Sequence, residues 1–329
     1  MSVEVEKLTA RVQAEMDAIG RLRQEIEKVI IGQQDLIERL LISLFCGGHI
    51  LIEGVPGLGK TLAASTLARA VRASFQRIQF TPDLLPADLV GTLIYSPKDG
   101  DFKVHKGPIF HQIIVADEIN RAPAKVQSAM LEAMEEKQVT IGECSFRLDD
   151  LFMVLATQNQ IEHDGTYALP EAQTDRFMLK VKITYPSVDE ECLIMQRMGK
   201  MPPCQAVSPV LTPEDVARLK ALTGDIYMAG EVERYVLDLV QATRYPARYG
   251  LDIAPMIRYG VSPRASIALC LASKAHALLS GRGYVVPGDV KAIAPDVLRH
   301  RLILSYEAEA EEKTSDDLIE QILLAVSVP

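Results

Sequence analysis

The stretch GVPGLGKT, residues 54–61, restricts what this chain can fold into more than any other part of it. It fits the pattern G-x-x-x-x-G-K-[ST] of a phosphate-binding loop, whose backbone N–H groups surround phosphate oxygens at the start of a helix. A buried strand is indicated before the loop at 49–54, and a helix after it at 60–72. We therefore predict that a nucleoside triphosphate binds here. The residues expected to contact it are Gly54, Val55, Pro56, Gly57, Leu58, Gly59, Lys60, Thr61 and Leu62.

Strand-like and helix-like segments alternate beyond the loop. Further strands are indicated at 74–80, 111–118, 151–159 and 176–186, with a helix at 122–137. Such alternation predicts an α/β fold in which helices cover both faces of a parallel, five-stranded sheet. Ligands of these sheets bind at the carboxyl ends of the strands. We therefore expect the loop, the acidic pair at 117–118 and Asn159 to converge.

The strand pattern fades after the proline-containing segment 200–209. Three later helical segments begin with a proline suited to a first helical turn, at Pro213, Pro263 and Pro287. We predict two domains, one at 1–205 with an N-terminal helix and the nucleotide-binding sheet, and a small all-helical one at 206–329. The helix expected at 3–29 carries an apolar heptad stripe. We favour packing of this stripe on the next domain over a coiled coil with another chain.

Composition excludes several classes of protein. Hydrophobic residues make up 48% of the 329 residues and no uninterrupted apolar stretch is long enough to span a membrane, so we expect a globular chain without a membrane span. The five cysteines are scattered and form no C-x-x-C, which argues against a disulfide framework or a zinc site. The N-terminus lacks a secretory pattern. We expect a cytoplasmic protein.

The loop and the acidic pair predict a division of chemical roles. Lys60 is expected to reach the β- and γ-phosphates, and Thr61 to offer its hydroxyl to Mg²⁺. Asp117 would bind the same Mg²⁺ ion, and Glu118 would orient the attacking water or accept its proton. A glutamate at this place favours hydrolysis over transfer to a substrate hydroxyl. Asn159 would orient the water or contact the γ-phosphate.

Arg264 is expected at a helix position where a positive charge is unfavourable. In VSPRAS, Ser262 is expected to cap a helix that begins at Pro263, so Arg264 lies in the first turn. A cation there opposes the helix dipole by a few tenths to about 1 kcal/mol. A bound phosphate would supply the missing negative charge, although an arginine exposed to solvent is the simpler interpretation.

These segments, in this order, resemble the AAA+ ATPases and, within them, the MoxR family. The resemblance covers roughly residues 28–305 and implies an AAA+ P-loop domain followed by a helical lid. VIIGQ at 29–33, with Ile31, resembles the segment near adenine. ADEINRAP at 116–123 resembles the Walker B motif, and ATQN makes Asn159 sensor 1. TYALPEAQTDRF at 166–177 implies that Arg176 is an arginine finger, and RYGVSPRASIAL at 258–269 that Arg264 is sensor 2.

The resemblance also implies partners and cofactors. Proteins of this kind use ATP and Mg²⁺, usually form hexameric rings, and act as chaperones on partner proteins, often ones with von Willebrand factor A domains. They are linked to enzyme maturation and metal-cofactor insertion. A hairpin that this clade directs toward the ring pore is expected at 92–108. It carries Lys98, Lys103 and Lys106 between apolar residues.

Three other functions remain open from the sequence. A nucleic-acid motor would share the loop, but a formal net charge of -9 disfavours a phosphate backbone as partner unless a local basic channel exists. A small-molecule kinase is disfavoured by Glu118, by Arg176 and by a helical lid without an evident substrate pocket. A scaffold gated by nucleotide, with little turnover, is the third.

Overall fold

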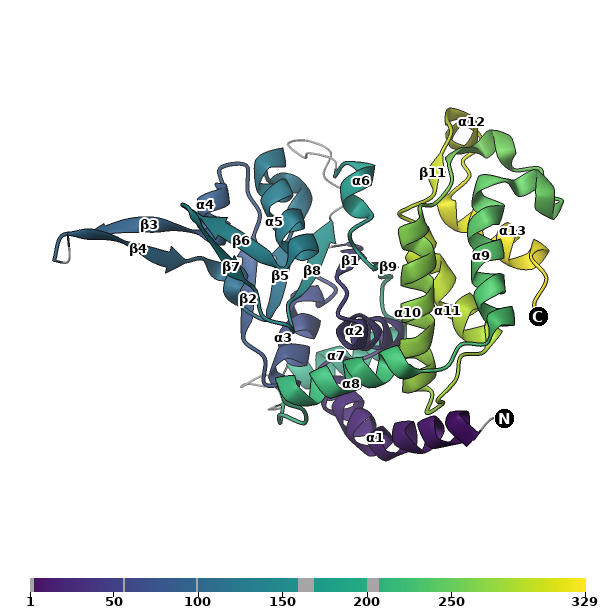
Figure 1. Ribbon diagram of the computed structural model, residues 1–329, viewed down its shortest axis with the longest axis horizontal. Helices are drawn as coiled ribbons and strands as arrows, with labels where there is room; N and C mark the ends of the chain where they lie inside the picture. Colours follow the sequence, from purple (N-terminus) through teal and green to yellow (C-terminus); the bar gives the residue numbers. More distant parts are fainter. Residues whose placement is uncertain (1–2, 56, 99, 159–168, 200–206) are drawn as a thin grey trace. The chain divides into compact units, whose positions relative to one another are not determined.

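The computed structural model describes residues 3–55, 57–98, 100–158, 169–199 and 207–329. These residues fall into two compact units (Figure 1). The sheet unit comprises Gly20–Phe177 and Val181–Ala217, and the helical unit comprises Met1–Ile19, Met178–Lys180 and Arg218–Pro329. The predicted division of the chain into domains at 1–205 and 206–329 remains a proposal.

A five-stranded sheet forms the centre of the sheet unit, as predicted. Its order is β2-β5-β8-β1-β9, and the described pairings are parallel. The strands are β1 (Ile50–Glu53), β2 (Phe75–Gln79), β5 (Ile113–Asp117), β8 (Met153–Gln158) and β9 (Leu179–Lys182). All four residues of β1 are buried, because helices cover both faces of the sheet.

Helices and short connections complete this unit. They are α2 (Gln34–Cys46), α3 (Lys60–Ala70), α4 (Pro86–Val90), η1 (Pro108–Phe110), η2 (Ile119–Arg121), α5 (Ala124–Glu136), α6 (Glu171–Thr174) and α7 (Val188–Met198). One buried core cluster joins Leu51 and Ile114 of the sheet to Val126 and Met130 of α5. The apolar face of α5 therefore fixes the backbone that follows the acidic pair.

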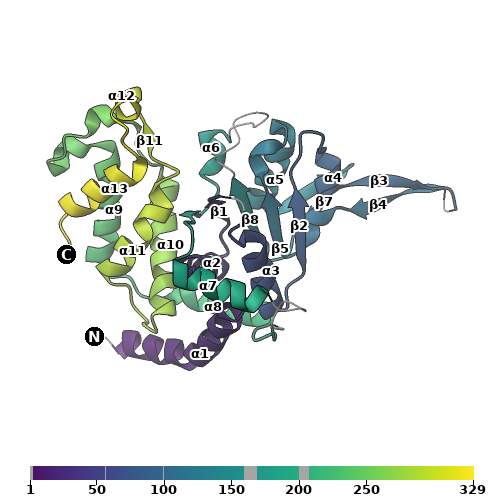
Figure 2. The same cartoon turned by 180° about the vertical axis from the view of Figure 1, so that it is seen from behind.

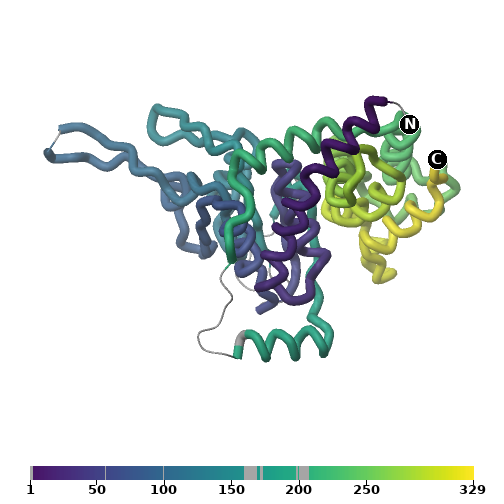
Figure 3. The backbone as a smooth tube through the Cα atoms, turned by 90° about the horizontal axis from the view of Figure 1, so that it is seen from below, coloured from purple at the N-terminus to yellow at the C-terminus, as the bar shows by residue number. Residues whose placement is uncertain are grey.

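Two hairpins extend from the sheet unit on the same side (Figures 1 and 3). The first was predicted, and pairs β3 (Gly91–Ser96) with β4 (Asp101–Lys106) in antiparallel register. The second, β6 (Gln138–Ile141) with β7 (Cys144–Arg147), was not predicted. Its turn contains Gly142, whose φ of 63° favours glycine.

The remaining chain is mainly helical, as predicted for the C-terminal region. Its elements are α8 (Pro213–Asp225), α9 (Gly230–Arg244), η3 (Pro246–Tyr249), η4 (Ala254–Met256), β10 (Ile257–Tyr259), α10 (Pro263–Leu279), α11 (Pro287–Leu298), β11 (Ile303–Leu304), α12 (Tyr306–Ala310) and α13 (Ser315–Ala325). The three predicted proline starts are all found. The Ser262 hydroxyl caps α10 by accepting the Arg264 N–H at 3.2 Å. A short β10–β11 pairing accompanies the helices (Figure 2).

The N-terminal helix α1 (Val3–Glu27) buries its heptad stripe against its own chain. Val5, Val12 and Ile19 are at most 6% exposed. Within the helical unit the Gln13 amide donates to the Gly281 carbonyl at 2.6 Å. The stripe therefore forms part of a folded core, as preferred over a coiled coil. Over the described ranges, no helix combines the length and apolar character needed to cross a membrane.

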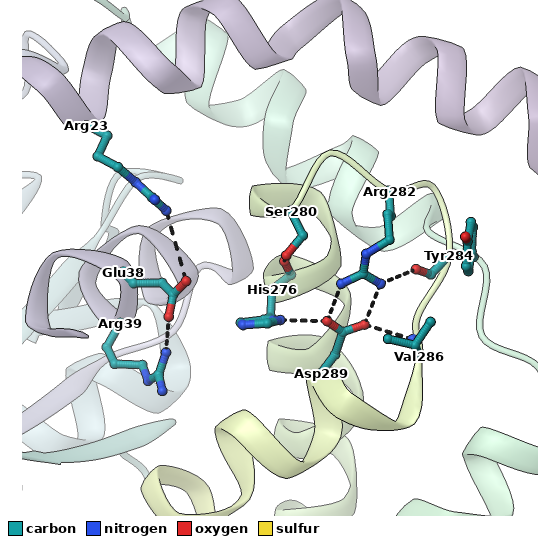
Figure 4. Close-up of polar contacts among 9 residues, drawn as sticks. All are labelled: Arg23, Glu38, Arg39, His276, Ser280, Arg282, Tyr284, Val286 and Asp289. Carbon is teal, nitrogen blue, oxygen red and sulfur yellow. Dashed lines mark hydrogen bonds and ion pairs between the residues drawn. The ribbon is translucent and has the colours of Figure 1, made fainter. Parts of the chain in front are cut away.

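A buried carboxylate joins α10 to α11 (Figure 4). Asp289, 1% exposed, accepts hydrogen bonds from the Arg282 guanidinium, from His276 Nδ1 at 2.6 Å and from the Val286 N–H at 2.7 Å. Burial by itself raises the pKa of Asp289, but the bonds from Arg282, His276 and Val286 bring the net pKa below its usual value. The charged carboxylate therefore stabilises the turn between the two helices.

Replacing this carboxylate should destabilise the helical unit in a pH-dependent way. We expect Asp289→Asn to cost about 3 kcal/mol near neutral pH, because Arg282 loses its buried counterion. Because the pKa of Asp289 is lower in the folded than in the unfolded chain, its charge stabilises the fold fully above the unfolded pKa of about 3.9. This stabilisation is lost as the pH falls through the folded pKa, so the stability deficit of Asp289→Asn should vanish there. Hydrogen exchange of α10 and α11 from pH 3 to 7 measures this. A deficit that stays constant down to pH 3 would contradict the assignment.

Candidate nucleotide site

The predicted phosphate loop has the backbone that such a loop requires. It leads from β1 into α3, and Gly57 and Gly59 have φ values of 88° and 74°, which favour glycine. The cavity beside it, about 450 Å³, is lined by Gly54, Gly57, Leu58, Gly59, Lys60, Thr61, Leu62, Arg77, Asp117, Glu118, Thr157 and Gln158. Most of the predicted loop residues therefore surround one cavity with the acidic pair. Val55 lies in the loop without lining the cavity, and Pro56 lies outside the described residues.

The acidic pair lies at the carboxyl end of β5, and β8 lies between β5 and β1 in the sheet. Asp117 Oδ1 accepts the Thr157 hydroxyl at 2.6 Å, and the same hydroxyl accepts the Glu118 N–H at 2.9 Å. Glu118 has a φ of 55°, which non-glycine residues seldom adopt. Such backbone costs on the order of 1 kcal/mol and is concentrated at functional sites. Thr157 of the neighbouring strand thus holds both acidic residues in place.

Basic and amide side chains also bind the acidic pair, and these were missed by sequence reasoning. On β2, Arg77 donates to Asp117 Oδ2 from Nε at 3.0 Å and from Nη2 at 2.6 Å. Gln79, two residues later, donates to Glu118 Oε2 at 3.0 Å, as does Arg121 from η2. The segment SFQRIQF did carry a signal, because Arg77 and Gln79 are polar residues within a strand of otherwise partly apolar character. Their partner became visible only from the pairing of β2 with β5.

Lys60 interacts with both the phosphate loop and the nearby carboxylates. Its ammonium donates to the Gly54 carbonyl within the loop. Burial lowers the pKa of Lys60, while attraction to the carboxylates of Asp117 and Glu53 opposes this shift. A half-buried cation requires a charged or polar partner, and a phosphate group in the cavity would provide one.

The donor atoms of the cavity fit Mg²⁺. Thr61 brings a hydroxyl and Asp117 a carboxylate, and Mg²⁺ prefers such hard oxygen ligands. In the part of the chain that is described, no cluster of three or more His, Cys, Asp or Glu residues could hold a metal alone. Mg²⁺ usually combines one or two protein oxygens with substrate phosphates and water, and these two donors suit that mode.

The other predicted site residues are not among the described residues that line this cavity. Arg176 forms an ion pair with Glu135 of α5 at 3.7 Å and does not line the cavity. Arg264 belongs to the helical unit, in the first turn of α10. Ile31 lies in the loop after α1, and Gln33 links this loop to the phosphate loop by donating to the Leu58 carbonyl at 2.9 Å. Asn159 lies outside the described residues.

A glycine loop after β1 and an acidic pair after β5, in a parallel sheet, define a P-loop nucleotide-binding fold. Comparison with known families narrows this class. Residues 49–179 match the ATPase family associated with various cellular activities (AAA), and residues 251–322 match the AAA lid domain. The first match contains the whole cavity, and the second lies in the helical unit.

Similar proteins extend the match to nearly the whole chain. Chaperone MoxR1 of Mycobacterium tuberculosis is 46% identical over 96% of this chain and 84% of its own. Protein MoxR of Paracoccus denitrificans is 33% identical over 92% of this chain and 93% of its own. A solved structure from Cytophaga hutchinsonii, of a protein proposed to be an ATPase, has a TM-score of 0.92 and 48% identity, and covers 98% of both chains. The chain belongs to the MoxR family of AAA+ ATPases.

The Thr157 hydroxyl gives a direct test of how the acidic pair is held. Thr157→Val keeps the shape of the side chain but removes both hydrogen bonds, so Asp117 keeps the bonds from Arg77 and loses the one that orients Oδ1. We expect the Mg²⁺-dependent part of nucleotide affinity to fall about 10- to 100-fold, as for other residues that orient metal ligands. Titration of a fluorescent ATP analogue with and without Mg²⁺ measures this. Thr140→Val, on an exposed hairpin strand, is the control, and equal Mg²⁺ dependence in both variants would refute the role of Thr157.

Proposed function

We propose that this chain hydrolyses ATP with Mg²⁺ and uses the free energy to remodel partner proteins. The observation that carries this proposal is Glu118, a carboxylate that lines the loop cavity directly after Asp117, the proposed Mg²⁺ ligand. Lys60 binds the β- and γ-phosphates, and Thr61 and Asp117 hold Mg²⁺, which neutralises phosphate charge. Glu118 orients the attacking water and accepts its proton.

Arg176 acts in this proposal on the nucleotide of a neighbouring chain. Its guanidinium lies outside the cavity of its own chain, and its side chain is 29% exposed beside Glu135. A guanidinium that reaches a neighbour's γ-phosphate stabilises the charge that develops there, an effect worth on the order of 10³–10⁵ in rate. The active form is then a homo-oligomer, which we propose is a hexameric ring. From the family resemblance we assign Asn159 and Arg264 roles at the nucleotide site, and Ile31 a role in adenine binding.

The hairpin β3–β4 is the proposed contact with partner proteins. Its register pairs Leu93 with Val104 and Tyr95 with Phe102, so these four side chains share one face. All four are exposed, at 37–61%. Tyr95 and Phe102 form an edge-to-face ring pair with centroids 5.4 Å apart. Exposed apolar faces of this kind mark protein-binding surfaces.

The wider biological role is also a proposal, and it takes up what the family resemblance implies. One similar protein carries the name chaperone, which supports action on other proteins. We propose partners with von Willebrand factor A domains, and maturation steps that include metal-cofactor insertion. A nucleic-acid partner is disfavoured by the net charge of -9.

Separate substitutions of Glu118 and Lys60 test hydrolysis against binding. Glu118→Gln keeps the size and hydrogen bonding of the side chain but cannot accept a proton, so ATP should bind while turnover falls at least about 100-fold. Lys60→Ala should instead weaken ATP binding itself. Equilibrium binding and steady-state phosphate release measure the two effects. Glu132→Gln, on the exposed face of α5, is the control, and normal turnover by Glu118→Gln would rule out its role.

Replacing residues 94–102 by a short Gly-Ser turn should separate hydrolysis from work on a partner. Basal turnover should stay near that of the intact chain, because the hairpin lies outside the nucleotide cavity. Proteins that co-purify with the ATP-trapped Glu118→Gln variant should no longer bind.

Single substitutions give a finer test. Tyr95→Ser and Phe102→Ser change the apolar face of the hairpin, and Thr92→Ser on the opposite face is their control. Unchanged remodelling of a recovered partner by the Gly-Ser variant would contradict this role.

A further inference from the structure

Two arginines of the helical unit bind the outer edge of β9. Arg299 Nη1 donates to the Lys180 carbonyl at 2.8 Å, and Arg301 Nη1 donates to the Met178 carbonyl at 3.1 Å. Residues two apart in a strand direct their carbonyls to the same edge. β9 is the last strand in the sheet order, and the N–H of Ile183 faces β1 by donating to Glu53. The carbonyls of Met178 and Lys180 therefore belong to the edge that none of the described strands covers.

Both arginines are fixed by further bonds, so this contact differs from a surface ion pair. Arg301 is 7% exposed and also donates to the Val297 carbonyl in the last turn of α11. Such terminal carbonyls lack partners within the helix. Arg299 is bound by Asp296 at 2.7 Å and by Asp316 of α13 at 2.9 Å. The planar guanidinium is pre-organised for several hydrogen bonds at once, so each arginine is held in one geometry.

The residues that these arginines bind lie next to the proposed finger in the chain. Met178–Lys180 groups with the helical unit, although the residues on either side of it belong to the sheet unit. Arg176 precedes Met178 by two residues, so their Cα atoms lie within roughly 7 Å of one another. The backbone that Arg299 and Arg301 bind is therefore only two residues from Arg176 in the chain.

We propose that Arg299 and Arg301 are positioning residues for Arg176. They attach the strand after the finger to α11, so that the helical unit of one chain sets the finger that serves its neighbour's nucleotide. This inference rests on the proposed in-trans role of Arg176. It adds a physical route by which the helical unit, which carries Arg264, controls hydrolysis in the adjacent subunit.

A double-mutant cycle tests this route. Arg301→Met keeps the apolar stem and removes the donors, and should lower turnover about 10- to 100-fold by misplacing the finger while ATP affinity in the same chain is unchanged. If Arg301 acts through Arg176, the double variant Arg176→Ala/Arg301→Met should be no slower than Arg176→Ala alone. Hydrogen exchange at residues 178–182 should rise in Arg301→Met. Arg282→Met, which removes another partly buried arginine of the helical unit, should lose stability without this change in turnover.

The outcomes separate two kinds of failure. Normal turnover by Arg176→Ala would overturn the in-trans finger and this inference together. A slow Arg176→Ala combined with normal turnover by assembled Arg301→Met would overturn this inference alone, as would multiplying defects in the double variant. If Arg301→Met does not assemble, Arg299→Gln and Arg301→Lys replace it in the same cycle. Wild-type turnover in both of these folded variants would equally reject the proposal.

Discussion

The position of β5 between β2 and β8 is the constraint on which the whole site depends. Parallel pairing brings the carboxyl ends of these strands to one edge, with Gln79 beside Asp117 and Ala156 beside Ala116. From that register, Thr157 holds the acidic pair from one side while Arg77 and Gln79 bind it from the other. A shift of one residue would turn each of these side chains to the opposite face of the sheet. The core cluster that joins α5 to the sheet therefore maintains the geometry of the proposed catalytic site as well as stability.

The charge distribution around the acidic pair differs from the net charge of the whole chain. The net charge is -9, yet Lys60, Arg77 and Arg121 surround the acidic pair at close range. Arg77 and Arg121 compensate two carboxylates that would otherwise repel each other and any incoming phosphate. Lys60 provides the positive charge next to the loop, where the N-terminus of α3 adds its dipole. An acidic chain can thus offer a polyanionic nucleotide a site with locally positive charge.

Local patterns allowed much of this structure to be predicted. The glycines at 57 and 59, the Ser262 cap and the helical start at Pro263 depend on neighbours in sequence, and so do the five strand segments. Arg77 and Gln79 could not be assigned, because chain order does not determine that β2 pairs with β5. The Asp289 cluster spans a turn between two helices and has no motif of its own. The hairpin β6–β7 was missed because strands of four residues give too short an alternation to be recognised.

The central claim is that the hydrolytic site is completed by a neighbouring chain. Mixing two inactive variants, Arg176→Ala and Lys60→Ala, tests it most directly, because some interfaces in a mixed assembly pair an intact Lys60 site with an intact Arg176. We predict that each variant alone is nearly inactive and that turnover returns in the mixture, with a maximum at intermediate ratios. Titration of wild-type chains with each variant controls for strict coupling around the ring. Confirmed mixed assembly without any return of turnover at any ratio, or full turnover by a monomer, would contradict the claim.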